Sequence, residues 1–233
     1  MGNKGARGVP AFAGRPYVAA VDLLVLAKEP IPGRVKTRLC PPCTAAEAAG
    51  LAAACLADTL EAACAAGADR VLVALDGRPG DWLPPGVRVV GQGRGGLDRR
   101  LARAWSHARG PAVQVGMDTP QVGAAGLAAA LAALDAPGVD AAFGPALDGG
   151  WWAVGMRRPD PSAFVGVPTS RADTGARQRR RLAARGRVVD LPAARDVDEV
   201  ADACAVAAAA PDTRFARAFA ALDLGAVPAE ARA

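Results

Sequence analysis

Short apolar runs alternate along this chain with longer alanine-rich segments of helical periodicity. The apolar runs are typical of strands buried on both faces of a parallel sheet, and the longer segments of helices packed against such a sheet. We expect strands at 21–27, 70–76, 87–90, 111–117, 139–143, 151–156 and 187–191, and helices at 44–66, 98–109, 123–134, 197–208 and 212–222, with an arginine-rich helix inside 168–185. Thr44, followed by Glu47, has the pattern of a capping box at the first helix. The alternation predicts an α/β fold with a mostly parallel central sheet.

The first expected strand ends abruptly in a loop crowded with proline, glycine and cations. Pro30 and Pro32 each fix φ and lack an N–H, so neither a strand nor a helix continues, and Gly33 permits a turn. Two of the chain's three lysines lie in this loop, although arginine is the common cation elsewhere. The loop residues that suit a phosphate group are Lys28, Gly33, Arg34, Lys36, Thr37 and Arg38. Cations beside free backbone N–H groups favour a polyphosphate site, and a solvated basic loop is the alternative.

The strand expected at 111–117 runs directly into Asp118-Thr119-Pro120. Open α/β sheets bind their ligands at the carboxyl ends of the strands, so an acid at this position is a candidate site residue. A carboxylate there can hold Mg²⁺ or Mn²⁺, which take their remaining ligands from phosphates and water. The alternative is that Asp118 only caps the following turn.

A glycine-dense turn, 91–97, follows the third expected strand. Its glycines let the backbone approach a flat ligand, and Gln92 offers both a donor and an acceptor to a nucleobase edge. The alternative is a flexible connector in which Asp98 caps the next helix.

Further candidates lie in the second half of the chain. Asp148 stands in a turn before Trp151 and Trp152, where the parallel pattern breaks, so this segment can lie across the site as an acidic, aromatic wall on the acceptor side. Polar residues at 169–173 are a possible second phosphate or acceptor contact. Asp196 and Asp198 precede an expected helix, and we interpret them as helix-capping acids.

Composition narrows the function classes only a little. The 233 residues suit one domain, expected at 18–223, between a disordered leader at 1–17 and a tail at 224–233. The net charge of +5 and the pI near 9.3 follow from a general arginine bias, without a basic stripe interleaved with aromatics, so we expect no nucleic-acid partner. We also expect no membrane partner and a cytoplasmic location.

The five cysteines form an odd set, which argues against a closed disulfide framework. Cys40 and Cys43 have C-x-x-C spacing, typical of zinc or redox pairs, but the only histidine, His107, is far along the chain. We favour incidental thiols.

Four segments resemble, in order and spacing, the GT-A-type transferase family described as radical-SAM/selenodomain-associated, some members of which are assigned to arsenosugar-pathway glycosyl transfer. They are AKEPIPGRVKTRL at 27–39, GMDTP at 116–120, GPALDGGWWAVG at 144–155 and DVDE at 196–199. The resemblance covers about 20–220. The guanylyltransferases of molybdenum-cofactor and coenzyme F420 synthesis are more distantly similar. The chain departs from the family pattern at Trp151-Trp152, where an aromatic pair usually begins with Tyr, and at 167–170, where W-S-T is common.

The resemblance implies a single-domain, Rossmann-like α/β/α sandwich of GT-A type that binds a nucleotide across the strand ends. It places the phosphates on the loop from Lys28 to Arg38, and Asp118 at the metal ligand of the family. Asp148 becomes a second metal ligand or an acceptor contact. The residues expected near the base are Gln92, Gly95, Gly96 and Leu97.

These features predict a metal-dependent transferase in which Asp118, Asp148 and Lys36 carry the chemistry. We expect a nucleotide or nucleotide-sugar donor, a small-molecule acceptor and Mg²⁺ or Mn²⁺. Glycosyl transfer is the favoured reaction, nucleotidyl transfer with release of pyrophosphate is the alternative, and a non-catalytic nucleotide-binding protein is a further one.

Overall fold

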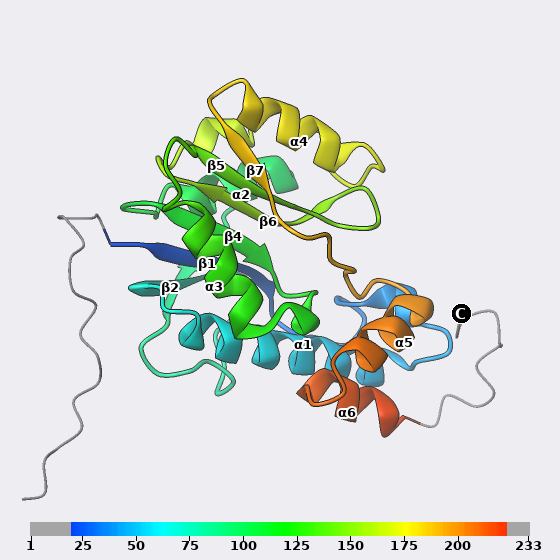
Figure 1. Ribbon diagram of the computed structural model, residues 1–233. Helices are drawn as coiled ribbons and strands as arrows, with labels where there is room; N and C mark the ends of the chain where they lie inside the picture. Colours follow the sequence, from blue (N-terminus) through cyan, green and yellow to red (C-terminus); the bar gives the residue numbers. More distant parts are fainter. Residues whose placement is uncertain (1–19, 223–233) are drawn as a thin grey trace, which may run out of the picture.

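The computed structural model describes residues 20–222, so the predicted leader at 1–17 and the tail at 224–233 lie outside the described residues. Seven strands form one sheet in the order β3-β2-β1-β4-β6-β5-β7 (Figure 1). Their bounds are Asp22–Lys28 (β1), Arg70–Asp76 (β2), Arg88–Gly91 (β3), Ala112–Gly116 (β4), Ala141–Pro145 (β5), Trp151–Met156 (β6) and Val188–Asp190 (β7). The predicted α/β fold with a mostly parallel sheet is confirmed.

One strand reverses the direction of the sheet. β6 lies between β4 and β5 and is antiparallel to both, whereas every other pairing is parallel. The start of β6 therefore lies at the same edge as the ends of β1 and β4. The turn that precedes β6 is thereby brought to the edge where α/β sheets place their ligands.

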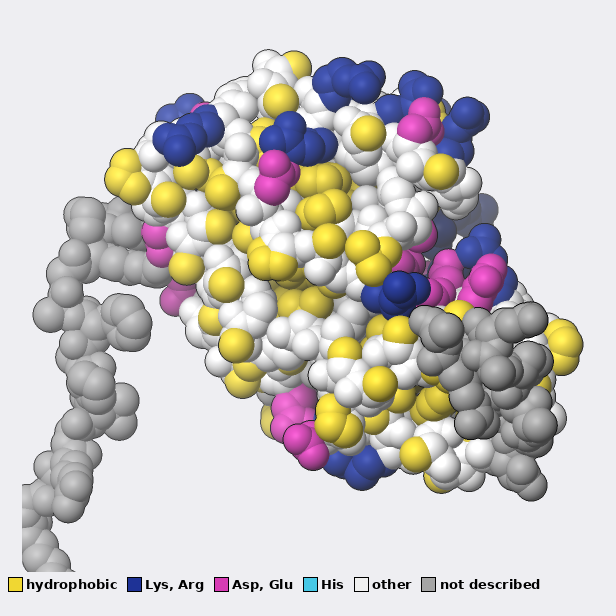
Figure 2. Space-filling model, turned by 45° about the vertical axis from the view of Figure 1, so that its right-hand side comes forward, with side chains coloured by type: hydrophobic (Ala, Val, Ile, Leu, Met, Phe, Trp, Pro, Cys, Tyr) yellow, Lys and Arg dark blue, Asp and Glu magenta, His cyan; other side chains and the backbone are white. Residues whose placement is uncertain are grey.

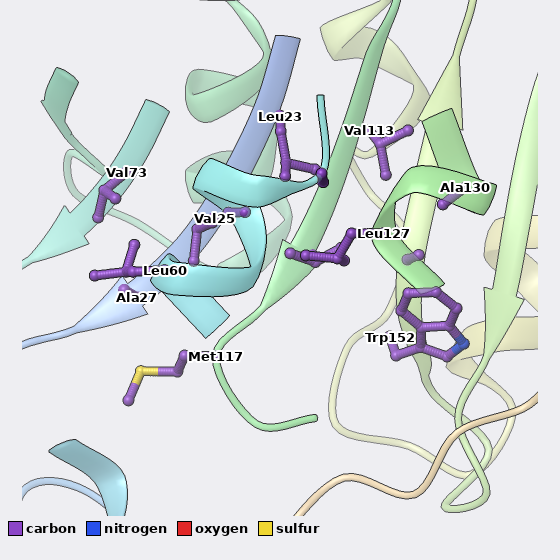
Figure 3. Close-up of a cluster of buried hydrophobic side chains, with 14 of the residues drawn as sticks. Leu23, Val25, Ala27, Leu60, Val73, Val113, Met117, Leu127, Ala130 and Trp152 are labelled. Atoms are coloured by element: carbon purple, nitrogen blue, oxygen red, sulfur yellow. The ribbon is translucent and has the colours of Figure 1, made fainter. Parts of the chain in front are cut away.

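Helices cover both faces of the sheet (Figure 1). Their bounds are Ala45–Ala65 (α1), Leu97–Trp105 (α2), Gly123–Ala133 (α3), Thr174–Ala183 (α4), Val200–Ala209 (α5) and Arg214–Ala220 (α6), with short 3₁₀ helices at Thr37–Leu39, Pro120–Val122 and Pro161–Ala163. α1 and α3 pack on one face, where Leu60 and Leu127 meet Leu23 and Val25 of β1 (Figure 3). α2 and α4 pack on the other face. α5 and α6 add a third cluster against the outer side of α1.

α1 illustrates how local sequence and packing combine. The Thr44 hydroxyl accepts a hydrogen bond from the Glu47 N–H at 3.2 Å, and the Glu47 carboxylate accepts from the Thr44 N–H at 2.7 Å, which confirms the capping box. α1 is, among residues 20–222, the one helix long and apolar enough to cross a membrane, yet most of it is buried within the domain. Such burial is typical of a core helix.

Candidate functional site

Two cavities meet at the carboxyl ends of β1 and β4. The first, here called the loop cavity, measures about 380 Å³ and is lined by the loop that follows β1 and by the start of α2. The second, the acidic cavity, measures about 610 Å³ and extends over β4 and β6 toward α5. Residues common to both linings are Leu26, Arg38, Leu97, Gly116, Asp118 and Asp198. A third, mostly apolar cavity of about 410 Å³ between α3 and α5 is lined by one of the residues expected at the site, Trp152.

Lys36 lies where the two cavities join. It adopts the left-handed conformation, with φ of 49°, which few residues other than glycine do, and its side chain is 7% exposed. Its ammonium forms an ion pair with Asp118 and donates a hydrogen bond to the Val197 carbonyl oxygen. Burial on its own lowers the pKa of this ammonium, but nearby carboxylates, Asp118 foremost, more than offset that effect, and the pKa lies above its ordinary value. Lys36 therefore stays charged.

The segment 196–198 lies against this ion pair. The Val197 N–H donates to the Asp118 carbonyl oxygen at 2.9 Å, and Arg38 Nη1 donates to Asp198 Oδ2 at 2.7 Å. Two segments far apart in the sequence, the loop after β1 and the linker before α5, thus hold each other at the site. Figure 2 shows acidic and basic side chains next to one another at this side of the molecule.

Six carboxylates line the acidic cavity: Asp118, Asp148, Asp196, Asp198, Glu199 and Asp202. Of these, Asp118 and Asp198 also line the loop cavity. Burial, followed by the charge of Asp148, raises the pKa of Asp196 to about 6. Burial also raises the pKa of Asp198, and the charges of Lys36 and Arg38 only partly offset it. Both shifts have burial as their first cause, and neighbouring carboxylates add to it.

The interpretation of Asp196 and Asp198 as helix caps is wrong. The N-cap of α5 is Glu199, and its capping box is completed by Asp202, whose carboxylate accepts from the Glu199 N–H at 3.0 Å. Asp196 and Asp198 line the acidic cavity instead. Asp196 and Asp198 follow β7, which is parallel to β5, and they line the same cavity as Asp118. That position after a parallel strand is the signal that could have found them.

An oxygen-rich site of this kind fits a divalent cation. Carboxylate oxygens are the donors that Mg²⁺ and Mn²⁺ prefer, and Asp118 and Asp198 line both cavities at this edge. Within the described part of the chain, no three Asp, Glu, His or Cys side chains are close enough together to form a metal site by themselves. A cation held by Asp118 and a neighbouring carboxylate would need further oxygens from a ligand.

The loop that we expect to bind phosphate lines the loop cavity. The predicted residues that line the cavity are Lys28, Arg34, Lys36, Thr37, Arg38, Gln92, Leu97 and Asp118. Gly33, Gly95 and Gly96 do not line it. Gly33 and Gly95 have positive φ of 76° and 110° and serve as turn residues, and Gly96 is the N-cap of α2.

Gln92 is buried, and its amide is engaged within the protein. Its Nε2 donates to the Ala27 and Ala74 carbonyl oxygens at 2.8 and 2.9 Å, and its Oε1 accepts from Arg100 Nη1 at 3.1 Å. The amide therefore joins the ends of β1 and β2 below the cavity and positions Arg100, a lining residue that sequence reasoning missed. The alternative in which Asp98 caps α2 is wrong, because the N-cap is Gly96 and Asp98 lies in the first turn of the helix. The Asp98 carboxylate accepts a hydrogen bond from the Gly166 N–H at 3.0 Å.

The expected wall of two indoles is half correct. Trp151 lines the acidic cavity, whereas Trp152 is 5% exposed on the opposite face of β6, where its Nε1 donates to the Pro192 carbonyl oxygen at 2.9 Å. Successive residues of a strand point to opposite faces, so two adjacent tryptophans cannot line one cavity. Asp148, in the turn before β6, lines the acidic cavity and accepts from the Gly150 N–H at 2.7 Å.

A second loop borders the acidic cavity. Thr169, Ser170 and Arg171 line it, as the sequence suggested for acceptor contacts, while Asp173 pairs with Arg177 instead. This loop is joined to the turn before β6 by a hydrogen bond from the Gly175 N–H to the Gly149 carbonyl oxygen at 2.8 Å. The contact is close, because a Cβ on Gly149 would lie 2.0 Å from the Ala172 carbonyl oxygen.

None of the five cysteines lines either cavity. All five are free, and Cys43 is buried in the cluster between α1 and α6. Burial, followed by the neighbouring Cys40, raises the pKa of the Cys43 thiol, which is the opposite of what a reactive thiolate requires.

Comparison with protein families matches residues 46–171 to DUF2064, described as an uncharacterized protein conserved in bacteria. Comparison with curated proteins gives no match. Among solved structures, a protein from Desulfovibrio desulfuricans G20, provisionally named a nucleotide-diphospho-sugar transferase, is 28% identical, with a TM-score of 0.74 over 86% of this chain and 92% of its own. This likeness supports the prediction that the chain is a transferase.

Other similar structures agree on the fold. A nucleotidyl transferase from Methanothermobacter thermautotroptrophicus is 17% identical, with a TM-score of 0.53 over 78% of this chain and 94% of its own. The mannosyltransferase PcManGT from Pyrobaculum calidifontis, solved with GDP-Man and Mn²⁺, is 16% identical, with a TM-score of 0.50 over 91% of this chain and 67% of its own. At these identities the likeness shows the fold alone, and it confirms the predicted GT-A-like architecture.

Proposed function

The chain belongs to the DUF2064 family, and we propose that it is a nucleotide-dependent transferase that moves a sugar from a nucleotide-sugar donor to a small-molecule acceptor with the help of Mg²⁺ or Mn²⁺. The donor's nucleotide occupies the loop cavity and the acceptor approaches through the acidic cavity. The resemblance to radical-SAM/selenodomain-associated transferases, including those of the arsenosugar pathway, supports glycosyl transfer over other reactions.

The observation that carries this proposal is the pairing of Lys36 with Asp118 at the junction of the two cavities. One side of the junction is cationic, with Arg34 and Arg38 beside Lys36, and suits the phosphates of a donor. The other side is acidic and suits a cation and a hydroxyl that must lose its proton. A transfer reaction needs both kinds of group at one point, because charge develops on the leaving phosphate while the acceptor is deprotonated.

In glycosyl transfer, an acceptor hydroxyl oxygen forms a bond to the anomeric carbon, and the bond from that carbon to the donor phosphate breaks. The electron pair leaves with the phosphate oxygen, and the hydroxyl proton passes to a carboxylate, which we assign to Asp148 in the turn before β6. Lys36, Arg34 and Arg38 stabilise the charge that grows on the departing nucleotide. Asp118, together with Asp148 or Asp198, would hold a divalent cation, and this cation would supply further neutralisation of the diphosphate.

A panel of nucleotide sugars and nucleoside triphosphates, each with Mg²⁺, Mn²⁺ or EDTA, tests the proposal by thermal shift and by product analysis. A ligand at a hundredfold excess over its Kd stabilises the fold by about 2.7 kcal/mol, so binding is readily seen. We expect one nucleotide sugar to give a metal-dependent shift and to release its nucleoside diphosphate in wild type but not in Asp118→Ala. Unchanged turnover in Asp118→Ala would contradict the proposal.

Nucleotidyl transfer is the second candidate, since the loop cavity suits a triphosphate equally well and the more distant resemblance is to guanylyltransferases. It predicts a shift with a nucleoside triphosphate and release of pyrophosphate. A protein that only binds nucleotides predicts a shift without turnover.

A further inference from the structure

Gln114 is a buried polar residue whose side-chain oxygen has no hydrogen-bond partner. It lies in the middle of β4 and is 1% exposed, and its Oε1 makes no hydrogen bond within the described residues. The other fully buried glutamines among these residues are paired: Gln92 as described above, and Gln178 through its Nε2, which donates to the Ala163 carbonyl oxygen at 3.0 Å. An unpaired buried polar group costs about 1–3 kcal/mol, so such a group calls for an explanation.

The amide faces the acidic cavity. Gln114 is one of its lining residues, together with Leu101 of α2 and Trp151 of β6. On the same face of β4, the next residue toward the junction with the loop cavity is Gly116, which places no side chain between Gln114 and Asp118. A Cβ on Gly116 would have only the Asp118 N within 4 Å, at 3.9 Å, so the space above it is open.

The surroundings of Gln114 define what can bind there. Its cross-strand neighbours are Leu24 on β1 and Val154 on β6, and both are buried and apolar. A charged group at this depth would be costly because it would lack a counter-ion, whereas an uncharged polar group can pair with the amide. The amide offers two donors and an acceptor, and Trp151 adds an indole ring that suits contact with the body of a ring.

We propose that Gln114 is a specificity-determining residue that hydrogen-bonds an uncharged, hydroxyl-bearing ring at the inner end of the acidic cavity. This inference rests on the proposed function, under which the ring is either the sugar of the donor or the body of the acceptor. In both cases the reacting atoms stay at the junction beside Asp118, while the ring's hydroxyl groups reach the sheet.

Side-chain amide resonances of ¹⁵N-labelled glutamine test this directly. The Gln114 pair is the one missing from the Gln114→Met spectrum, since Met has nearly the shape of Gln and no amide. The probes, added with Mg²⁺, are the common nucleoside diphosphates, their glucose and mannose conjugates, and methyl glucoside and methyl mannoside. Glucuronate and glucose 6-phosphate serve as charged rings.

We expect the Gln114 resonances to move with uncharged rings and not with nucleoside diphosphates or charged rings. A shift with a nucleotide sugar only would assign the ring to the donor, and a shift with a methyl glycoside would assign it to the acceptor. If nucleoside diphosphates bind by thermal shift but no uncharged ring moves the Gln114 resonances, the inference fails and the proposed function stands. If methyl glycosides move them and no nucleotide binds, the proposed function fails and the inference stands; if neither binds, both fail.

A matched pair of variants gives a second readout. Gln114→Met removes no hydrogen bond within the protein and should leave the Tm unchanged or higher, whereas Gln178→Met removes one and should lower it. For the nucleotide sugar identified by the panel, kcat/KM should fall about a hundredfold or more in Gln114→Met, because a site built to bind a hydroxyl discriminates strongly once its partner is lost. An unchanged kcat/KM in Gln114→Met would overturn the assignment.

Discussion

The buried ammonium of Lys36 forms an ion pair with the carboxylate of Asp118, across a sequence separation that runs from the first strand of the sheet to the fourth. Both residues follow the carboxyl end of a parallel strand, β1 and β4, which pair directly. The fold thus brings together a group that binds phosphate and a group that binds a cation.

Lys36→Met should weaken the binding of a nucleoside diphosphate by about a hundredfold, since a hydrogen bond to a charged group contributes roughly 1.5–3 kcal/mol. Isothermal titration calorimetry with Mg²⁺ measures the loss. Arg88→Met is the control, because Arg88 is an exposed cation on β3 that lines neither cavity. If Arg88→Met loses as much affinity as Lys36→Met, the loss reflects the overall charge and not the position of Lys36.

Asp198→Asn and Asp202→Asn should separate function from capping. Asp198 is destabilised by burial of its charge, so its neutral variant should keep or raise the Tm while metal-dependent turnover falls. Asp202→Asn loses a capping interaction worth about 1 kcal/mol, and its Tm should fall by roughly 2–4 °C. Thermal unfolding in EDTA and turnover with Mn²⁺ provide the two measurements, and the reverse pattern would restore Asp198 as a structural residue.

The two tryptophans of β6 should likewise differ. Trp152→Ala opens a hole in the core between β6 and α3 and should cost about 3–5 kcal/mol of unfolding free energy. Trp151→Ala should lower turnover with a smaller loss of stability, because Trp151 is only half-buried and borders the acidic cavity. Urea unfolding monitored by circular dichroism compares them, and a larger stability loss in Trp151→Ala would contradict the assignment of faces.

Stability should depend on the ion pair between Asp160, which caps the 3₁₀ helix Pro161–Ala163, and Arg185, which follows α4. The Arg185 side chain, followed by Ser162, holds the pKa of Asp160 below its ordinary value. An acid with a lowered folded-state pKa stabilises the fold above its unfolded-state pKa, and this contribution is lost as the pH falls through the folded-state pKa. Asp160→Asn should therefore cost about 0.5 kcal/mol at pH 7, given its exposure, and nothing near pH 2.

Urea titrations of wild type and Asp160→Asn at both pH values measure this difference. Asp81→Asn, in a loop outside both cavities, is the control for the loss of one negative charge. A cost that is the same at both pH values would mean that the ion pair contributes nothing.

The sequence was sufficient for the strands, the helices and the proximity of Lys36 and Asp118. Lys36 and Asp118 stand within a few residues of strongly apolar strands, and parallel strands put their carboxyl ends at one edge, so their proximity follows from the pattern. The separate faces of Trp151 and Trp152 also follow from strand geometry, once β6 is known to begin at Trp151.

Other parts of the site depended on contacts that no pattern encodes. An acid before a helix is equally typical of a cap and of a ligand, and only the position of Glu199 and Asp202 decides the matter for Asp198. Gln92 follows the end of β3, and Gln114 lies in the middle of β4. The Gln92 amide is hydrogen-bonded within the protein, whereas the side-chain oxygen of Gln114 has no partner. That difference depends on which carbonyl oxygens lie within reach after the strands have paired.

The hydrogen bond from Gly175 to Gly149, and the close fit of Gly149 against Ala172, bear on how acceptor preference can be altered. The turn before β6 and the loop before α4 contact each other directly, although β6 lies between them in the sequence. Grafting either segment alone from a relative would bring a foreign backbone against its partner at contact distance. A chimera designed to take a different acceptor should therefore exchange 145–151 and 168–175 together and keep the residues that line the loop cavity unchanged.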